Sequence, residues 1–232
     1  MRLAIMQPYF FPYIGYFQLV AAVDRFVFYD DVNFIKNGWI NRNRVLDGER
    51  NRYVTVPLSG ASPSLKIRDI AVQPREIWLR KMLESIRHAY AKAPHYAAVS
   101  ALIEQCLSAP VAQISALASR SVVDVCHYLD IDTEFVPSST QFGNSELKGV
   151  NRVLDICAKE RAGIYVNLPG GRDLYDDATF RSNGVELAFV EPNLSAYAQF
   201  DHAFQPGLSI LDVLMFNSKD RVRAMLSVEA RS

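Results

Sequence analysis

Two adjacent aspartates near the start of the chain are the first candidates for chemistry. Asp30 and Asp31 directly follow the apolar segment 25–29, which we predict to be a strand. Paired carboxylates at the end of a strand can hold Mg²⁺ or act as a general base. His202 is the one histidine expected in a loop, but no serine or cysteine nucleophile accompanies it, so no hydrolytic triad is predicted. The predicted catalytic residues are Asp30, Asp31 and His202.

Cationic and amide side chains follow the two aspartates as far as residue 44. Cations beside a carboxylate pair, in a chain of zero formal charge, indicate a small anionic ligand such as a phosphate or a carboxylate. The alternative is a solvated loop whose charges pair with one another. The candidate binding residues of this segment are Lys36, Trp39, Asn41, Arg42, Asn43 and Arg44.

The segment 7–17 places tyrosine and phenylalanine rings between two prolines and a glycine. Stiff rings with hydroxyl groups suit a sugar or a nucleoside, through stacking and hydrogen bonds. A helix that begins near Pro12 would also offer free N–H groups to an anion. The alternatives are an aromatic core layer and an oligomer contact. The candidate binding residues here are Gln7, Pro8, Tyr9, Tyr13, Gly15 and Tyr16.

Two later segments add weaker candidates. Gly170 and Gly171 end a predicted strand, so their N–H groups can cradle a phosphate, with Arg172 adding charge and Tyr175 following. A plain tight turn explains the same residues nearly as well. Tyr197 and Gln199 are predicted to face a ligand from a loop.

The elements that would position these residues begin with a βαβ unit. Segments 3–6 and 25–29 are short apolar runs, and segment 13–23 between them is typical of a helix with proline near its start. Two strands joined through a helix are parallel. Because ligands of parallel sheets gather at the carboxyl ends of the strands, we expect the site next to Gln7 and Asp30.

The remaining chain continues this pattern around a helical middle. Strands are predicted at 52–58, 66–72, 134–137, 164–168 and 185–190, and helices at 74–91, 95–107, 111–129, 145–161 and 174–182. One or two helices are predicted over 208–226. The predicted fold is a single α/β domain over residues 1–232. It has a parallel-sheet, Rossmann-like core and a helical subregion at 74–130.

Composition excludes several classes of protein. The 232 residues carry 25 Lys and Arg against 25 Asp and Glu, which argues against general nucleic-acid binding. The three cysteines form no CxxC or zinc spacing, so a reducing cytoplasm is expected and no metal site is predicted from ligand spacing. The longest weakly polar stretch, 13–23, is too short to span a membrane.

Two motifs resemble the nucleotidylyltransferase superfamily. Tyr13-Ile14-Gly15-Tyr16 stands where that superfamily has an HxGH motif, and both histidines are tyrosines here. Ser138-Ser139-Thr140, after a later predicted strand, resembles the superfamily's Ser-Ser-Thr motif. The resemblance implies a distantly nucleotidylyltransferase-like core and suggests ATP with Mg²⁺, although the residues themselves fix no cofactor.

Taken together, several segments resemble the WbqC-like family. The matching segments are 7–17, 36–44, 56–58, 167–175, Tyr197, Gln199 and 208–217. Their ordered combination is specific and spans nearly the whole chain, whereas 74–130 contributes little. The resemblance implies a bacterial protein associated with the biosynthesis of O-antigen or another surface polysaccharide.

The resemblance also implies a nucleotide-linked amino sugar as the partner, because genes of the family tend to accompany those for such sugars. We hypothesise amide formation, in which an activated acyl or aminoacyl group passes to the amine of the sugar, by analogy with pantothenate synthetase. Tyr9, Tyr13 and Tyr16 would line the pocket, and Asp30 or Asp31 would deprotonate the amine or hold Mg²⁺. The alternatives are a non-catalytic sugar-nucleotide-binding or scaffold protein, and a transferase that uses a thioester or an aminoacyl-tRNA. Whether the chain forms a homodimer is left open by the sequence.

Overall fold

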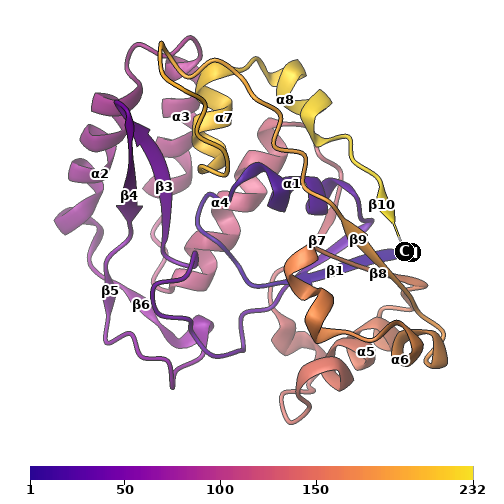
Figure 1. Ribbon diagram of the computed structural model, residues 1–232. Coiled ribbons are helices and arrows are strands. Elements are labelled where there is room, and N and C mark those ends of the chain that lie inside the picture. The colour runs from indigo at the N-terminus through magenta and orange to yellow at the C-terminus, as the bar shows by residue number, and fades with distance from the viewer. Residues whose placement is uncertain (232) are drawn as a thin grey trace.

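A six-stranded sheet forms the centre of the computed structural model, which describes residues 1–231 (Figure 1). Its spatial order is β10-β9-β8-β1-β2-β7. The strands are β1 (Arg2–Met6), β2 (Arg25–Phe28), β7 (Glu134–Val136), β8 (Ile164–Asn167), β9 (Glu186–Val190) and β10 (Ala230–Arg231). Every neighbouring pair is parallel except β9 and β10. The prediction of an α/β chain with a mostly parallel sheet is confirmed.

The central strand β1 is buried on both faces, as its apolar sequence predicts. Ala4 packs in the larger hydrophobic cluster, which includes α1 (Ile14–Ala21), whereas Leu3 and Ile5 pack in a second cluster with α5 (Gly149–Lys159). Successive side chains of a strand point to opposite faces, so the two clusters lie on the two sides of the sheet. The helix α1 connects β1 to the parallel strand β2, which is the predicted βαβ unit.

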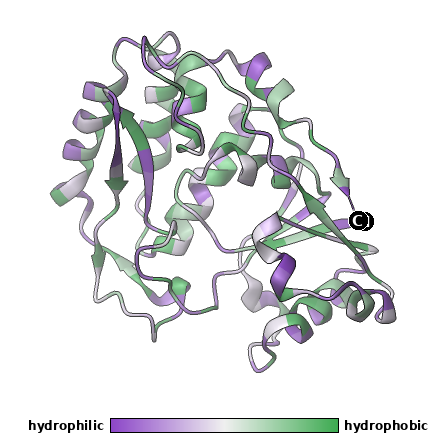
Figure 2. Cartoon of the chain, in the orientation of Figure 1, coloured by the Kyte–Doolittle hydropathy of each residue, from purple (hydrophilic) through white to green (hydrophobic). Residues whose placement is uncertain are grey.

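Three helices form the predicted helical middle of the chain. They are α2 (Arg75–Tyr90), α3 (Tyr96–Ser108) and α4 (Ile114–Tyr128), each within two or three residues of its predicted bounds. In α2 the buried residues recur at every fourth position, at Trp78, Met82, Ile86 and Tyr90. Figure 2 shows the corresponding mixture of hydrophobic and hydrophilic residues around this helix.

The strand pairing after residue 40 differs from the prediction. Segment 41–44 is not a loop, because it begins β3 (Arg42–Asp47), which pairs antiparallel with β4 (Arg50–Thr55). Of the predicted strands 52–58 and 66–72, only the short segments β5 (Leu58–Ser59) and β6 (Ala71–Val72) pair with each other. Gly48, with a φ of 63°, makes the turn between β3 and β4. An Asp-Gly pair between strands is a strong hairpin signal, and it was the sequence feature that could have revealed β3.

The C-terminal part returns to the sheet through short helices. These are η2 (Ser139–Phe142), η3 (Pro169–Leu174), α6 (Asp177–Ser182), α7 (Ile210–Phe216) and α8 (Lys219–Leu226), and η1 (Ile67–Asp69) precedes β6. Of the one or two helices predicted over 208–226, the structure has two, because Ser218 accepts a hydrogen bond from the Arg221 N–H and so caps a new helix. Among residues 1–231, no helix has both the length and the apolar character needed to cross a membrane.

Candidate functional site at the carboxyl edge of the sheet

Three of the predicted site residues, Gln7, Asp30 and Asp31, lie just beyond the ends of the parallel strands β1 and β2. Numbered by their order along the chain, the five parallel strands lie in the order 5-4-1-2-3, so the chain changes direction between β1 and β8. Ligands of open parallel sheets bind at such a switch point, beyond the carboxyl ends of the strands. The loops that leave this edge run toward β3–β6 (Figure 1).

Gln7 follows β1 and Asn167 ends β8, the two strands at the switch point. The Oε1 atom of Gln7 is buried and has no hydrogen-bond partner among the described residues. The Oδ1 atom of Asn167 accepts from the Leu168 N–H at 2.8 Å, and its Nδ2 atom lies against Gly171, where a Cβ would come within 2.5 Å. Gly171 is therefore needed for this close approach, whereas Gly170 has open space around it.

An aromatic cavity of about 230 Å³ lies beside this edge. It brings together residues of two predicted segments with two residues of the C-terminal part. Its lining is Tyr9, Pro12, Tyr13, Trp39, Asn43, Arg44, Leu194 and Gly207. The tyrosine-rich loop and the cation-rich segment, which were separate predictions, thus meet in one cavity.

The loop that forms one wall of the aromatic cavity is held rigidly. The Nδ2 atom of Asn43 donates to the backbone carbonyls of Phe10 (3.1 Å) and Phe11 (2.9 Å), and the Ser209 hydroxyl also donates to Phe11 (2.7 Å). The Phe11 N–H donates to the Ser121 hydroxyl at 2.9 Å. Phe11 has a φ of 39°, a conformation that a bulky residue keeps only when its surroundings impose it.

The polar groups of the cavity are Arg44 and two tyrosine hydroxyls. The guanidinium of Arg44 lies 5.4 Å from the Trp39 ring centroid and donates to the Gly207 carbonyl at 3.4 Å, while its Nε is buried without a partner among residues 1–231. Burial raises the pKa of both Tyr9 and Tyr13, and at Tyr13 the neighbouring Tyr9 adds to this. Both hydroxyls therefore stay protonated near neutral pH and can donate hydrogen bonds.

The predicted HxGH-like segment is arranged differently from a phosphate cradle. The Tyr13 ring lies over the first turn of α1, so that a Cβ on Gly15 would come within 2.4 Å of it. Tyr16 is fully buried, and its hydroxyl donates to the Gln7 carbonyl at 2.9 Å. Tyr16 thus belongs to the core behind the cavity wall, where the expectation that it lines the pocket fails.

The two aspartates after β2 have different partners. Asp31 forms a buried ion pair with Arg152 of α5 through one carboxylate oxygen, and the Ser139 hydroxyl donates to the other. Arg152 is held in turn by Asn144, which accepts from its Nε at 3.0 Å. Because both oxygens of Asp31 are engaged, this residue is a fixed structural anion rather than a free base or Mg²⁺ ligand.

Asp30 is the more suitable proton acceptor. Its carboxylate accepts from the Ser138 hydroxyl at 2.7 Å, and its residue is 5% exposed. Burial raises the pKa of Asp30, while the hydrogen bond from Ser138 acts in the opposite direction. Ser138 and Ser139 were noted in the sequence only as a motif, and Arg152 was missed because its polar partners are distant in the chain.

The other predicted cations lie outside the aromatic cavity. Arg42 stacks on the Tyr53 ring at 4.4 Å, and Lys36 is exposed. Arg172 forms an exposed ion pair with Glu191 at 2.6 Å. Asn41 donates from its side chain to the Val56 carbonyl at 2.9 Å.

Three further predicted residues also lie elsewhere. Pro8 is buried beside Tyr9, Tyr175 packs edge-on against Tyr165, and His202 forms a tight turn with Gln199. No cavity lining described above contains any of them.

The side chains of Tyr197 and Gln199, predicted to face a ligand, make hydrogen bonds inside the fold. The Tyr197 hydroxyl (2.6 Å) and the Gln199 Nε2 (2.5 Å) both donate to one oxygen of Asp212, and the Tyr90 hydroxyl (2.7 Å) donates to the other. Gln199 and Asp212 are both fully buried. A buried polar network of this kind fixes the fold, and it explains the residues without a ligand.

Replacing Asp212 with asparagine is expected to lower the free energy of unfolding by about 1–3 kcal/mol, the cost of leaving a buried donor unpaired. One acceptor oxygen becomes an amide that cannot accept from Tyr90, Tyr197 or Gln199. Urea denaturation measures the change. Asp201→Asn, at an exposed loop carboxylate, is the matched control and should leave the midpoint unchanged. Equal effects of the two substitutions would show that the network contributes nothing.

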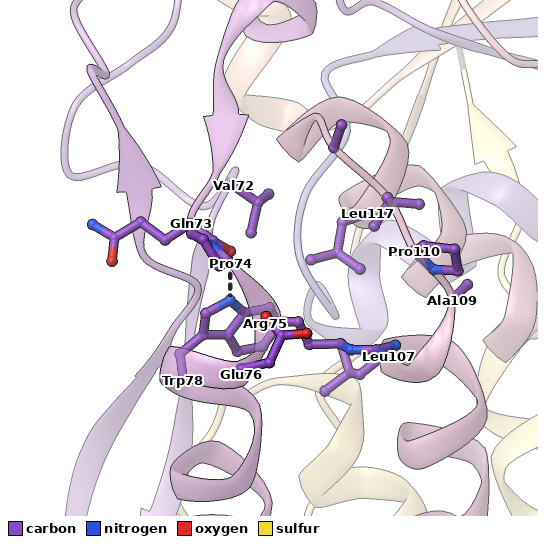
Figure 3. A pocket seen from close by; sticks show the side chains of 12 residues that line it. Val72, Gln73, Pro74, Arg75, Glu76, Trp78, Leu107, Ala109, Pro110 and Leu117 are labelled. Carbon is purple, nitrogen blue, oxygen red and sulfur yellow. Dashed lines mark hydrogen bonds between the residues drawn. The ribbon is translucent and has the colours of Figure 1, made fainter.

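A larger cavity, of about 380 Å³, lies away from these residues (Figure 3). It is formed between the start of α2 and the connection from α3 to α4, and its walls include Val72, Leu107 and Leu117. The Trp78 Nε1 donates to the Gln73 carbonyl at 3.0 Å along one wall. None of the predicted site residues lines it, so it is not the candidate site.

In the described part of the chain, no group of three or more His, Cys, Asp or Glu side chains is placed to hold a metal ion. The three cysteines are buried and unpaired, and burial raises the pKa of the Cys157 thiol to about 12. None of the three is therefore activated as a nucleophile.

The whole arrangement lies within the region matched by one family model. The model of the WbqC-like protein family matches residues 7–224. The chain belongs to this family. A WbqC-like relative from Mycobacterium tuberculosis (strain ATCC 25618 / H37Rv), called uncharacterized protein Rv1507c, is 29% identical over 219 residues, which cover 93% of each chain. No solved structure matches the chain.

Proposed function

We propose that this WbqC-like protein is an enzyme of surface-polysaccharide precursor biosynthesis. It would form an amide by transferring an acyl or aminoacyl group to the amine of a nucleotide-linked sugar. The observation that carries the proposal is the position of Asp30, a buried carboxylate at the carboxyl edge of a sheet that also borders an aromatic cavity. The carboxylate can act as the base that deprotonates the amine, and the aromatic cavity can bind a ring of the nucleotide-linked sugar.

The aromatic cavity suits one ring of the acceptor. Its volume of about 230 Å³ is below the roughly 300–1,000 Å³ of cavities that enclose a whole drug-sized ligand. The rings of Tyr9, Tyr13 and Trp39 offer stacking faces for a sugar or a base, and Arg44 offers charged donors to a phosphate or a hydroxyl. A nucleotide-linked sugar would extend from this cavity toward the sheet.

Asp30 supplies the base. An amine that arrives as an ammonium ion must lose a proton before its lone pair can attack an acyl carbon, and a carboxylate is a suitable acceptor when burial raises its pKa. Asp30 holds this first proton. The attack forms the N–C bond, the bond between the acyl carbon and its activating group then breaks, and the departing group takes the second proton that the nitrogen loses.

The geometry does not support an ATP site of the nucleotidylyltransferase kind at α1. The Tyr16 hydroxyl is buried on the Gln7 carbonyl, so it cannot contact a phosphate, and the Tyr13 ring covers the first turn of the helix. Numbered from the β7 side, the parallel strands lie in the order 3-2-1-4-5, which supports the proposed Rossmann-like core.

Mass spectrometry of a panel of nucleotide-linked amino sugars tests the proposal. Each sugar is incubated with the protein, amino acids or short acids, and either ATP with Mg²⁺ or an acyl thioester. A mass shift of the sugar by one acyl group is the expected result, and AMP release distinguishes ligation from transfer. Binding of a sugar without product from any donor would instead show a non-catalytic binding protein.

Arg44 provides a direct test of the aromatic cavity. Arg44→Ala is expected to weaken binding of the active nucleotide sugar by about 10–100-fold, the loss of a charge-assisted hydrogen bond. Isothermal titration calorimetry measures the dissociation constant. Arg50→Ala removes an exposed cation of the same hairpin and should leave binding unchanged. Equal weakening by both variants would indicate a general charge effect and remove Arg44 from the site.

A further inference from the structure

A second cavity at the carboxyl edge lies between η1 and η2 and has a volume of about 320 Å³. We call it the η1–η2 cavity. Its lining is Asp31, Lys66, Arg68, Asp69, Thr140, Gly143, Asn144 and Ser145. It therefore adjoins the segment of Asp30 and Asp31, although Asp31 is the one predicted site residue in its lining.

One wall of the η1–η2 cavity is cationic. Lys66 donates to the Asn33 side chain at 2.8 Å and has no carboxylate partner among the described residues. Arg68 contacts only the exposed neighbour Asp69, with Nε at 3.4 Å from its carboxylate. The charge of Asp31 is already neutralised by Arg152. An exposed pair such as Arg68 and Asp69 is worth little, so both cations are available to an oxyanion.

The opposite wall presents a hydrogen-bond acceptor connected to Asp30. The Ser138 hydroxyl lies 2.8 Å from that of Thr140 and donates to Asp30 at 2.7 Å. Since the Ser138 proton is used on the carboxylate, Thr140 must donate to Ser138. Thr140 therefore turns only lone pairs toward the cavity, where they can accept from an N–H group.

The two walls are fixed relative to Asp30. The Arg68 N–H donates to the Asp30 carbonyl, and the Ile67 N–H donates to the Val32 carbonyl, both at 3.0 Å. Lys66 is also bridged to Asn33 through the backbone. The cations thus lie on a segment bound directly to the chain that carries the base, which favours a preformed site.

We infer that the η1–η2 cavity is where the amine and the acyl donor meet. Lys66 and Arg68 bind an oxyanion of the donor, either a carboxylate or a phosphate, and Thr140 receives the ammonium group of the acceptor. Asp30 lines neither this cavity nor the aromatic cavity, so the hydroxyl pair is its route to the amine. This inference rests on the proposed function and names the site of its reaction.

The proton transfer through the hydroxyl pair is balanced. The ammonium gives a proton to Thr140 Oγ1, the Thr140 proton passes to Ser138 Oγ, and the Ser138 proton passes to Asp30 Oδ1. The products are a neutral amine and a protonated Asp30, and both hydroxyls are regenerated. Thr140 is a catalytic residue in this step because it contacts the ammonium group, whereas Ser138 is a positioning residue that acts through Asp30.

Oxyanion binding is tested without turnover. Acetate and inorganic phosphate are titrated separately by calorimetry into the unmodified protein and into Lys66→Ala/Arg68→Ala. The double variant is expected to bind the tighter anion at least about tenfold more weakly, as for the loss of charge-assisted hydrogen bonds. Arg80→Ala/Lys81→Ala removes the same charge from exposed positions of α2 and should bind normally.

The two anions distinguish the form of the donor. Tighter acetate binding indicates a free carboxylic acid, and tighter phosphate binding indicates a phosphorylated or nucleotide-activated donor. Binding of neither anion, or equal weakening in both double variants, would overturn the inference. The anion titration tests oxyanion binding in the η1–η2 cavity even where no amide product is found. Its failure can therefore be distinguished from failure of the proposed function.

The hydroxyl relay is tested with Thr140. Thr140→Val keeps the shape of the side chain and removes the oxygen, so kcat should fall at least about tenfold. The loss of a complete general acid or base typically costs more than this, about 100-fold or above. KM for the donor should stay unchanged, and Thr140→Ser should restore kcat. Equal activity of the valine and serine variants would show that no proton passes through this hydroxyl.

Discussion

Replacing Arg152 with methionine is expected to lower the free energy of unfolding by about 3–5 kcal/mol, the cost of breaking a buried ion pair by removing one partner. The side chains of Arg152 and Asp31 are only 4% and 7% exposed. Without the guanidinium, the Asp31 carboxylate stays buried with only the Ser139 hydroxyl as a side-chain donor. The packing of Arg152 on the Tyr29 ring, at 5.0 Å, is lost as well.

Urea denaturation of a double-mutant cycle measures this effect. Asp31→Asn removes the buried carboxylate charge that Arg152→Met leaves without its partner. The double variant Arg152→Met/Asp31→Asn should therefore be more stable than Arg152→Met alone, with a coupling energy of about 0.5–3 kcal/mol. Arg181→Met breaks an exposed ion pair with Asp177 on α6 and is expected to cost less than about 1 kcal/mol. If Arg152→Met costs no more than Arg181→Met, the ion pair does not anchor the carboxyl edge.

Arg152 also illustrates which part of the site the sequence could not reveal. Local periodicity located β1, α1 and β2, and the rule for parallel sheets then placed Gln7 and Asp30 at one edge. The partner of Asp31 lies 121 residues away on α5. Nothing in the spacing of either segment indicates that contact, because it depends on how the helix packs against the sheet.

The same limit applies to the loops. Tyr16, Tyr197 and Gln199 have residue types suited to a ligand, but their polar groups bond to Gln7 and Asp212 inside the fold. Residue type predicts that a polar group needs a partner and not whether that partner is a ligand or the protein. Tyr9, Tyr13 and Arg44 were predicted from residue type in the same way, and these three do line one cavity.

Asp30→Asn is expected to reduce turnover at least about 100-fold, the usual loss when a general base is removed. The asparagine keeps an acceptor for Ser138 and has nearly the same shape, so the site should stay intact. Mass spectrometry of amide formation measures the rate. Asp132→Asn, at an exposed carboxylate before β7, is the control and should turn over normally. Amide formation at the unmodified rate in Asp30→Asn would exclude Asp30 as the base.

The stability of Asp30→Asn should move in the opposite direction from its activity. Burial raises the pKa of Asp30 in the folded protein, so ionisation of this group opposes folding. The stability that protonated Asp30 contributes is fully present below its unfolded pKa and is lost as the pH rises through the folded pKa. The variant cannot ionise, so its stability relative to the unmodified protein should increase over that pH range. An ionised Asp30 therefore lowers the stability of the folded protein, which an asparagine at this position would not do. This trade of stability for an ionisable group is expected of a catalytic base.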